Sequence, residues 1–284
     1  MIAHGSGRSA EKPYMNDLNT SRGMDRADTG QWRLVIYITR TSLEAWLQPL
    51  ADRQASRRIV RDSWEPVGDG PDLLARIENT VYDHPQLLDD YSADIIIETD
   101  RAMWVPSEVG ADEERSEEVF NAVYGCEPED MMADRVDDKT LLWWLTPGLP
   151  AFLSRTFPGA RVSAHLGVIV SYLDRLRLPE GEVEVLNTRP GSCDVILLKD
   201  GELQTASTQR AGNPEEGIYR LLRASEVYGF SPRSAHIAVR DESGDDSALS
   251  EALDSLNLDA SILVEEERQM PTAALLMLSG ATKE

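Results

Sequence analysis

The stretch that decides the fold reads Glu182-Val-Glu-Val-Leu-Asn-Thr-Arg-Pro-Gly-Ser-Cys-Asp-Val-Ile-Leu-Leu-Lys-Asp-Gly-Glu-Leu-Gln-Thr205. It contains strand-like runs joined first by Pro190-Gly191 and then by Asp200-Gly201. Asp-Gly between alternating apolar runs is a strong hairpin signal, because both central positions of such a turn need a positive φ. A helical pattern follows from Pro214 to about Tyr228. We expect the three strands at about 182–188, 192–199 and 202–209.

The first half of the chain repeats this order of elements. A three-stranded antiparallel meander is expected between Trp32 and Trp64, then a helix over about 71–82 and a strand at Asp94–Glu98. We expect Ala102–Pro106 to be a partner of that strand. In the second half the helix is likewise followed by a strand, at Ala235–Val239. The pattern predicts a mixed α/β protein built as a duplicated βββαβα architecture.

The predicted organisation has three parts. Residues 1–30 are polar and lack periodicity, which is typical of a disordered tail. Residues 31–179 form the first expected domain and residues 180–284 the second, with Leu178-Pro-Glu-Gly181 as the boundary between them. A length of 284 residues fits two domains of ordinary size.

Composition narrows the class of partner and the compartment. The formal net charge is -22, which repels phosphate backbones, so direct binding of DNA or RNA is not expected. Two cysteines without CxxC spacing indicate neither a disulfide framework nor a zinc site. The first residues contain no apolar run typical of a signal peptide, so none is expected, and no run approaches the roughly 20 residues of a membrane span. The cytoplasm is therefore the expected compartment.

An acidic region covers residues 108–139. It contains twelve acidic residues against three basic ones. A divalent cation site would need carboxylates that converge at fixed spacing, and no such loop motif is present. The region is interpreted as a solvated acidic face, and the alternative is a surface for a basic protein partner.

The order of landmarks resembles a family of uncharacterised Bacteroidetes proteins, DUF3822, over about Trp32 to Gly280. The strand that ends in Val105-Pro106, the helix over 147–157 that ends in Phe-Pro, and His165 opening the next element carry the resemblance. The closing Pro271-Thr-Ala-Ala-Leu-Leu-Met-Leu-Ser-Gly280 also fits. The family has no assigned activity, and the resemblance implies a two-domain, actin-like ATPase fold of ribonuclease H-like domains.

A second resemblance, limited to about residues 184–222, is to the actin-like pilus assembly ATPases. Their strand-turn-strand reads Asp-x-Gly, a short turn, Asp, an apolar run, then Asp-Gly. Asp194 and Asp200-Gly201 match this pattern, whereas Asn187 stands for the first Asp and Arg189 for the Gly. In that family the first Asp helps to hold the metal-nucleotide and the Gly lets backbone amides approach phosphate. Asn187 lacks the charge, and Arg189 places a side chain where backbone is needed.

Two interpretations of the Arg189-Pro-Gly-Ser192 turn follow. It is either a plain hairpin turn in which Gly191 supplies a positive φ, or an anion site made of Arg189 and backbone amides. Ser192 has no Gly-x-Ser-x-Gly context and no nearby histidine for nucleophilic catalysis. The histidines at 84, 165 and 236 are isolated, so they could act together only if the fold gathers them.

The sequence therefore supports two functional hypotheses. The first is a non-catalytic binding or scaffold protein of actin-like fold, with no cofactor and with a protein partner, possibly a basic one. The second is a divergent ATPase that binds ATP with Mg²⁺ in the groove between the domains. In that case the nucleotide would contact Asn187, Arg189, Gly191, Ser192 and Asp194.

Overall fold

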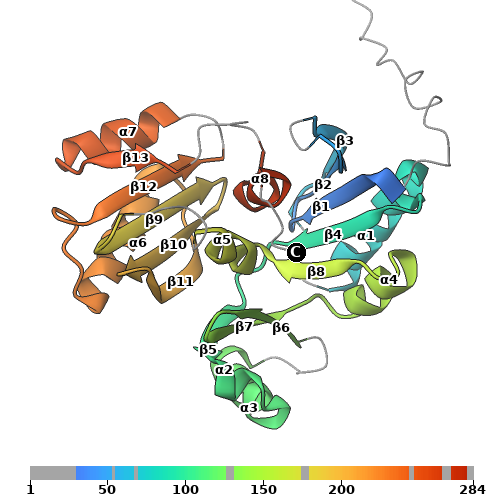
Figure 1. The fold of residues 1–284 in the computed structure, drawn as a ribbon, viewed down its shortest axis with the longest axis horizontal. Coiled ribbons are helices and arrows are strands. Elements are labelled where there is room, and N and C mark those ends of the chain that lie inside the picture. The colour runs from blue at the N-terminus through green and yellow to red at the C-terminus, as the bar shows by residue number, and fades with distance from the viewer. Residues whose placement is uncertain are drawn as a thin grey trace, which may run out of the picture.

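The computed structural model describes residues 30–52, 55–66, 70–125, 131–173, 179–242, 246–263 and 270–279. The predicted disordered tail lies outside the described residues except for Gly30. Two five-stranded sheets face each other across two helices, and a small three-stranded sheet lies below them in the view of Figure 1.

The first sheet has the strand order β3-β2-β1-β4-β8. Its first three strands pair antiparallel, and β4 and β8 then continue parallel to β1. Five consecutive side chains of β1, Leu34 to Ile38, are buried, as expected when helices cover both faces of a sheet. The elements are β1 (Trp32–Ile38), β2 (Ser42–Pro49), β3 (Arg57–Ser63), α1 (Pro71–Asp83), the 3-10 helix η3 (Pro85–Leu88), β4 (Ser92–Ile97) and β8 (Arg161–Ala164).

The second sheet repeats this topology with the order β11-β10-β9-β12-β13. Again β9, β10 and β11 pair antiparallel, and β12 and β13 run parallel to β9. The predicted duplication is thus confirmed at the level of strand pairing. The elements are β9 (Glu182–Arg189), β10 (Ser192–Lys199), β11 (Glu202–Arg210), α6 (Pro214–Tyr228), β12 (His236–Asp241), α7 (Asp246–Ser255) and β13 (Ala260–Ile262).

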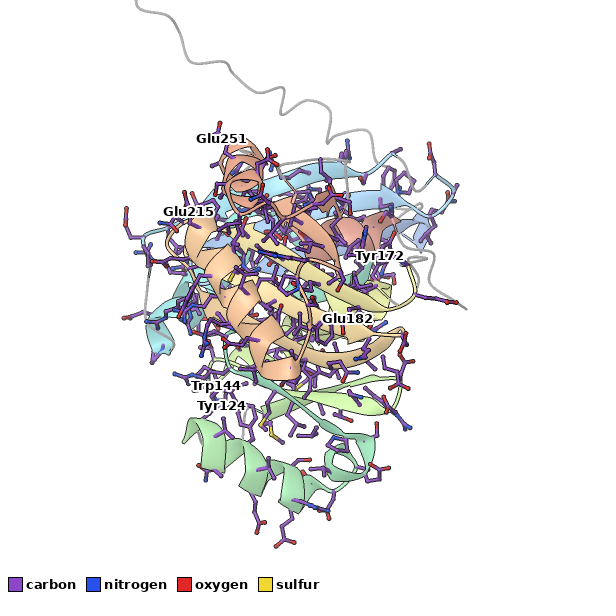
Figure 2. The ribbon with its side chains drawn as sticks, turned by 90° about the vertical axis from the view of Figure 1, so that its left-hand side faces the viewer. Tyr124, Trp144, Tyr172, Glu182, Glu215 and Glu251 are labelled. Carbon is purple, nitrogen blue, oxygen red and sulfur yellow. The ribbon has the colours of Figure 1, made fainter. Side chains whose placement is uncertain are left out.

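A third sheet, β5-β7-β6, is inserted between β4 and β8 and corrects one expectation. β5 does not pair with β4, because every residue of β5 lies opposite β7 in antiparallel register. Val105, Phe120 and Leu142 form a separate small core there, against which Tyr124 and Trp144 pack (Figure 2). The inserted elements are β5 (Ala102–Pro106), α2 (Ser107–Gly110), α3 (Glu113–Tyr124), β6 (Met131–Val136) and β7 (Lys139–Trp144), followed by α4 (Leu149–Thr156).

Two helices, α5 (His165–Leu173) and α8 (Thr272–Ser279), lie between the large sheets (Figure 1). They pack against each other, and α8 also packs against β1. Arg33 Nη1 donates to Met277 O at 3.0 Å and Gln48 Nε2 donates to Leu278 O at 2.6 Å. Helix α8 is therefore hydrogen-bonded to the first sheet, although it follows the second sheet in the chain. Among the described residues, no helix is long and apolar enough to cross a membrane.

Local sequence explains the boundaries of α6, which match the prediction at both ends. Asn213 is its N-cap and accepts a hydrogen bond from Glu216 N at 2.8 Å. Glu216 Oε2 accepts in turn from Gly212 N at 2.8 Å, and Pro214 occupies the first turn. Gly229, with φ 71, ends the helix in the left-handed region. Figure 2 shows α6 in front of the second sheet.

Replacing Asn213 by alanine is expected to lower the free energy of unfolding by about 1 kcal/mol, because the N–H of Glu216 loses its acceptor. Urea unfolding followed by circular dichroism measures the change. The matched control Asn213→Asp keeps an acceptor at the cap and should remain within a few tenths of a kcal/mol of the parent. Equal losses in both variants would contradict the capping role.

Candidate functional site

Strand alternation brings three of the five predicted site residues onto one face of the second sheet. Asn187 and Arg189 are two residues apart on β9, and Asp194 on β10 is the register partner of Asn187. Thr208 on β11 is in turn the partner of Asp194. Because successive side chains of a strand point to opposite faces, all four lie on the same side of the sheet. This side is the one that contacts His165, the first residue of α5.

Asp194 is the acceptor at the centre of a buried network and is 0% exposed. Arg189 binds it with two nitrogens, Nη1 to Oδ2 at 2.5 Å and Nη2 to Oδ1 at 2.9 Å. Asn187 Nδ2 donates to Oδ2 at 3.0 Å and Thr208 Oγ1 donates to Oδ1 at 2.8 Å. Both carboxylate oxygens therefore have several donors within the protein.

His165 completes the set of donors around Asp194. Its Nδ1 accepts from Thr99 N at 3.4 Å, which leaves Nε2 to donate to Asp194 Oδ1 at 3.1 Å. Burial raises the pKa of Asp194, but Arg189 and His165 outweigh burial and hold this pKa well below its usual range. The carboxylate is therefore ionised at neutral pH.

Arg189 also bridges the two large sheets. Its Nε lies 3.2 Å from Glu98 Oε2, beyond the end of β4, and Tyr37 OH on β1 donates to the same oxygen at 3.1 Å. Burial alone would lower the pKa of Arg189, but Asp194 and Glu98 raise it well above its usual value. Burial is the largest cause that raises the pKa of Tyr37, and the negative charges of Glu98 and Glu242 raise it further. The guanidinium is thus shared between one carboxylate of each sheet.

Asn187 connects this network to β12 and α8. Its Nδ2 donates to Glu242 Oε1 at 2.9 Å as well as to Asp194, and its Oδ1 accepts from Thr272 Oγ1 at 2.7 Å. Thr272 N also donates to Glu242 Oε1, at 2.8 Å. The amide of Asn187 therefore has a protein partner for its oxygen and two for its nitrogen, and its side chain is 0% exposed.

The remaining two predicted residues, Gly191 and Ser192, line a groove of about 810 Å³ between the two large sheets. Gly191 has φ 85, as the hairpin interpretation requires. The opposite wall comes from the β1–β2 turn and β3, with Arg40 and Trp64 among its residues. Arg40 Nη2 pairs with Asp100 Oδ1 at 2.8 Å. Arg189 also borders this groove, so Asn187 and Asp194 lie in the buried network alone, whereas Arg189, Gly191 and Ser192 line the groove.

The cysteine and the histidines of the described chain have the following surroundings. Cys193 lies behind the turn, and burial raises the pKa of its thiol to about 11, so it is not a thiolate at neutral pH. His84 and His236 have separate local partners, Thr80 O and Ser261 Oγ, and only His165 belongs to the network. Within the described ranges, no group of three or more His, Cys, Asp or Glu residues could hold a metal ion.

Sequence reasoning did not find six members of the network, namely Tyr37, Glu98, His165, Thr208, Glu242 and Thr272. Glu98 and Glu242 directly follow β4 and β12, which occupy equivalent places in the two sheets. The carboxyl ends of parallel strands meet at one edge, so a polar residue after each corresponding strand was a usable signal. His165 and Thr208 carried no comparable signal.

Comparisons with known proteins show what the chain is similar to. No protein-family model matches it, and no curated protein matches it in sequence. In structure it is similar to a Bacteroides thetaiotaomicron protein with an actin-like ATPase fold and unknown function. The TM-score is 0.77 at 18% identity, over 91% of this chain and 99% of that one. It is also similar to a chain of the PilM-PilN type IV pilus biogenesis complex, with a TM-score of 0.51 at 12% identity, over 87% and 96%. The chain therefore has the actin-like ATPase fold.

Proposed function

We propose that this chain is a non-catalytic protein of actin-like fold that binds a protein partner and needs no nucleotide. The observation that carries the proposal is the buried pair of Arg189 and Asp194 at the turn where the resembled ATPases bind phosphate. The charges at this turn are satisfied by side chains of the protein itself. Both terminal nitrogens of Arg189 donate to Asp194, and Asn187 Nδ2 donates to Asp194 and Glu242.

Electrostatics at the turn also disfavours a nucleotide. Two carboxylates, Asp194 and Glu98, pair with the guanidinium of Arg189, and a third, Glu242, accepts from the neighbouring Asn187. A triphosphate would have to displace Asp194 from Arg189 or sit beside these carboxylates. Breaking a buried ion pair costs about 3–5 kcal/mol, and like charges at close range add to that cost.

A protein partner is supported by charge and by one structural relative. The net charge of -22 favours a basic partner by steering and complementarity. The PilM-PilN structure shows that a similar fold occurs in a protein-protein complex. The proposal includes a cytoplasmic location, with which the buried free thiol of Cys193 is compatible. It also includes membership of the DUF3822 family, which the likeness to the Bacteroides protein supports.

A divergent nucleotide-binding ATPase is the second candidate. The groove of about 810 Å³ favours it, since this volume is within the range of ligand pockets. Gly191 and Ser192 could present backbone amides to a phosphate from the groove side without entering the buried network.

Calorimetric titration with Mg-ATP, Mg-ADP and Mg-GTP separates the two candidates. We expect no binding heat and no thermal shift at millimolar nucleotide. A nucleotide at 100 times its Kd would stabilise the protein by about 2.7 kcal/mol, which a thermal shift detects readily. Micromolar binding would overturn the proposal, and its loss in Ser192→Glu would assign that binding to the groove wall.

A further inference from the structure

A second groove lies on another part of the molecule, where the small sheet meets the second large sheet. Its volume is about 310 Å³, and it shares no lining residue with the groove between the large sheets. Four segments form it: the β6–β7 turn, the end of α5, the chain that leads into β9, and the β10–β11 turn. We call it the acidic groove, and its charged residues are Asp137, Asp138, Lys139, Glu180, Asp200 and Glu202.

The floor of the acidic groove is apolar. Val170 and Leu173 come from α5, and Val183 and Leu198 come from the second sheet, all at most 5% exposed. Leu203, which is half-buried, extends this floor toward the solvent. A floor of this kind accommodates an apolar side chain or the methylene stem of a lysine or arginine.

The rim carries a strong negative charge. Five of its residues are acidic, and all five are exposed. Among the described residues of the lining, Lys139 is the one basic residue, and its Nζ lies 3.4 Å from Asp138 Oδ1, so it neutralises only part of that charge. The rim therefore favours a cationic ligand, and its carboxylates lie in solvent where they can form ion pairs without a desolvation cost.

The spacing of these carboxylates does not suit a metal ion. In the part of the chain that the structure describes, no three acidic groups converge closely enough to hold one. Spread around an apolar floor, they instead match a ligand whose positive charges are themselves spread out. A second copy of this chain does not fit that description, because it carries the same net charge of -22.

We propose that the acidic groove binds a cationic amphipathic segment of the partner protein, with an apolar side chain on the floor and lysine or arginine side chains at the rim. This inference rests on the proposed function, because it identifies the surface and the chemistry by which the partner would be recognised. Binding of this kind depends on salt, since exposed ion pairs are screened at high ionic strength.

The test uses the full chain and fluorescein-labelled synthetic peptides in an anisotropy titration. The first probe alternates lysine with leucine over seven residues, and the second alternates lysine with serine at the same charge. We expect the lysine-leucine peptide to bind at least tenfold more tightly, because only it supplies side chains for the apolar floor. Equal affinities would overturn the inference.

Two triple variants locate the binding. The groove variant Asp138→Asn/Glu180→Gln/Glu202→Gln removes three rim charges from residues at ordinary negative φ. The control variant Glu118→Gln/Glu251→Gln/Asp259→Asn removes three exposed charges elsewhere. We expect the groove variant to weaken lysine-leucine binding at least tenfold and the control less than twofold. Equal effects would show attraction to net charge alone and overturn the inference. Thermal melting confirms that both variants are folded.

The nucleotide titration keeps this inference separate from the proposed function. Failure of the peptide to depend on the groove, with no nucleotide binding, removes the inference and leaves the proposed function in place. Groove-dependent peptide binding together with micromolar nucleotide binding supports the inference and overturns the non-catalytic proposal.

Discussion

Replacing Asp194 by asparagine is expected to lower the free energy of unfolding by about 3–5 kcal/mol, the range for removing one partner of a buried ion pair. Both oxygens of Asp194 accept from donors: Arg189 and Asn187 at Oδ2, and Arg189, Thr208 and His165 at Oδ1. An amide NH₂ group in either place would face at least two donors. The guanidinium of Arg189 would keep only Glu98 as a charged partner.

Urea unfolding at neutral pH measures this loss, with tryptophan fluorescence and circular dichroism as independent probes. The matched control is Glu226→Gln, which removes the carboxylate of the exposed Arg223–Glu226 pair on α6. An exposed pair contributes about 0–1 kcal/mol, so the control should stay near the parent. Similar losses in both variants would mean that Asp194 and Arg189 are not paired in solution.

Replacing Glu184 by glutamine is expected to change how stability depends on pH. Glu184 lies on β9 with 0% exposure, on the face opposite Val183 and Val185. Burial raises the pKa of its carboxyl from 4.5 to about 7, although the nearby Ser225 acts in the opposite direction. Because the folded-state pKa is the higher one, the folded protein keeps a proton that the unfolded chain releases. This contribution is complete below pH 4.5, declines as pH rises and is lost above about pH 7.

The difference between the pKa values corresponds to about 3 kcal/mol, at about 1.4 kcal/mol per pH unit. The Glu184→Gln variant should therefore gain about 3 kcal/mol relative to the parent between pH 4.5 and pH 8. Urea unfolding at both pH values, in the parent and the variant, measures this gain. Glu251→Gln, an exposed position on α7, is the control and should shift stability equally at the two pH values. A difference between parent and Glu184→Gln that does not vary with pH would contradict the raised pKa.

The order of elements was predictable because local signals carried it. Pro190-Gly191 and Asp200-Gly201 indicated the hairpins, and Asn213, Pro214 and Gly229 explain α6 within a few residues of chain. These signals act through backbone conformation and capping, which depend on near neighbours only. The repetition of this order indicated the duplicated architecture, and the strand order within each sheet came from the structure.

The small sheet shows where local reasoning stops. β5 was recognised as a strand, but its partner was predicted as β4 and is β7. A strand sequence indicates extended backbone and the spacing of its apolar residues, and it does not indicate which of several edges it joins. β6 was not expected, because Asp134 and Arg135 interrupt its apolar alternation. Asp134 is held there by a long-range contact, accepting from Ala164 N at 2.8 Å.

For the candidate site, too, part was determined by the sequence and part only by the tertiary structure. The sequence by itself determined that Asn187 and Arg189 stand where the resembled ATPases carry Asp and Gly, because those positions follow from the turn alone. Only the tertiary structure decided where the Arg189 guanidinium points, toward Asp194 and Glu98 and away from solvent. Asp194 and His165 are 29 residues apart in the chain, and Tyr37 and Glu98 are 61 apart. Burial and charge pairing depend on distances across the folded chain, and a linear pattern contains no such distances.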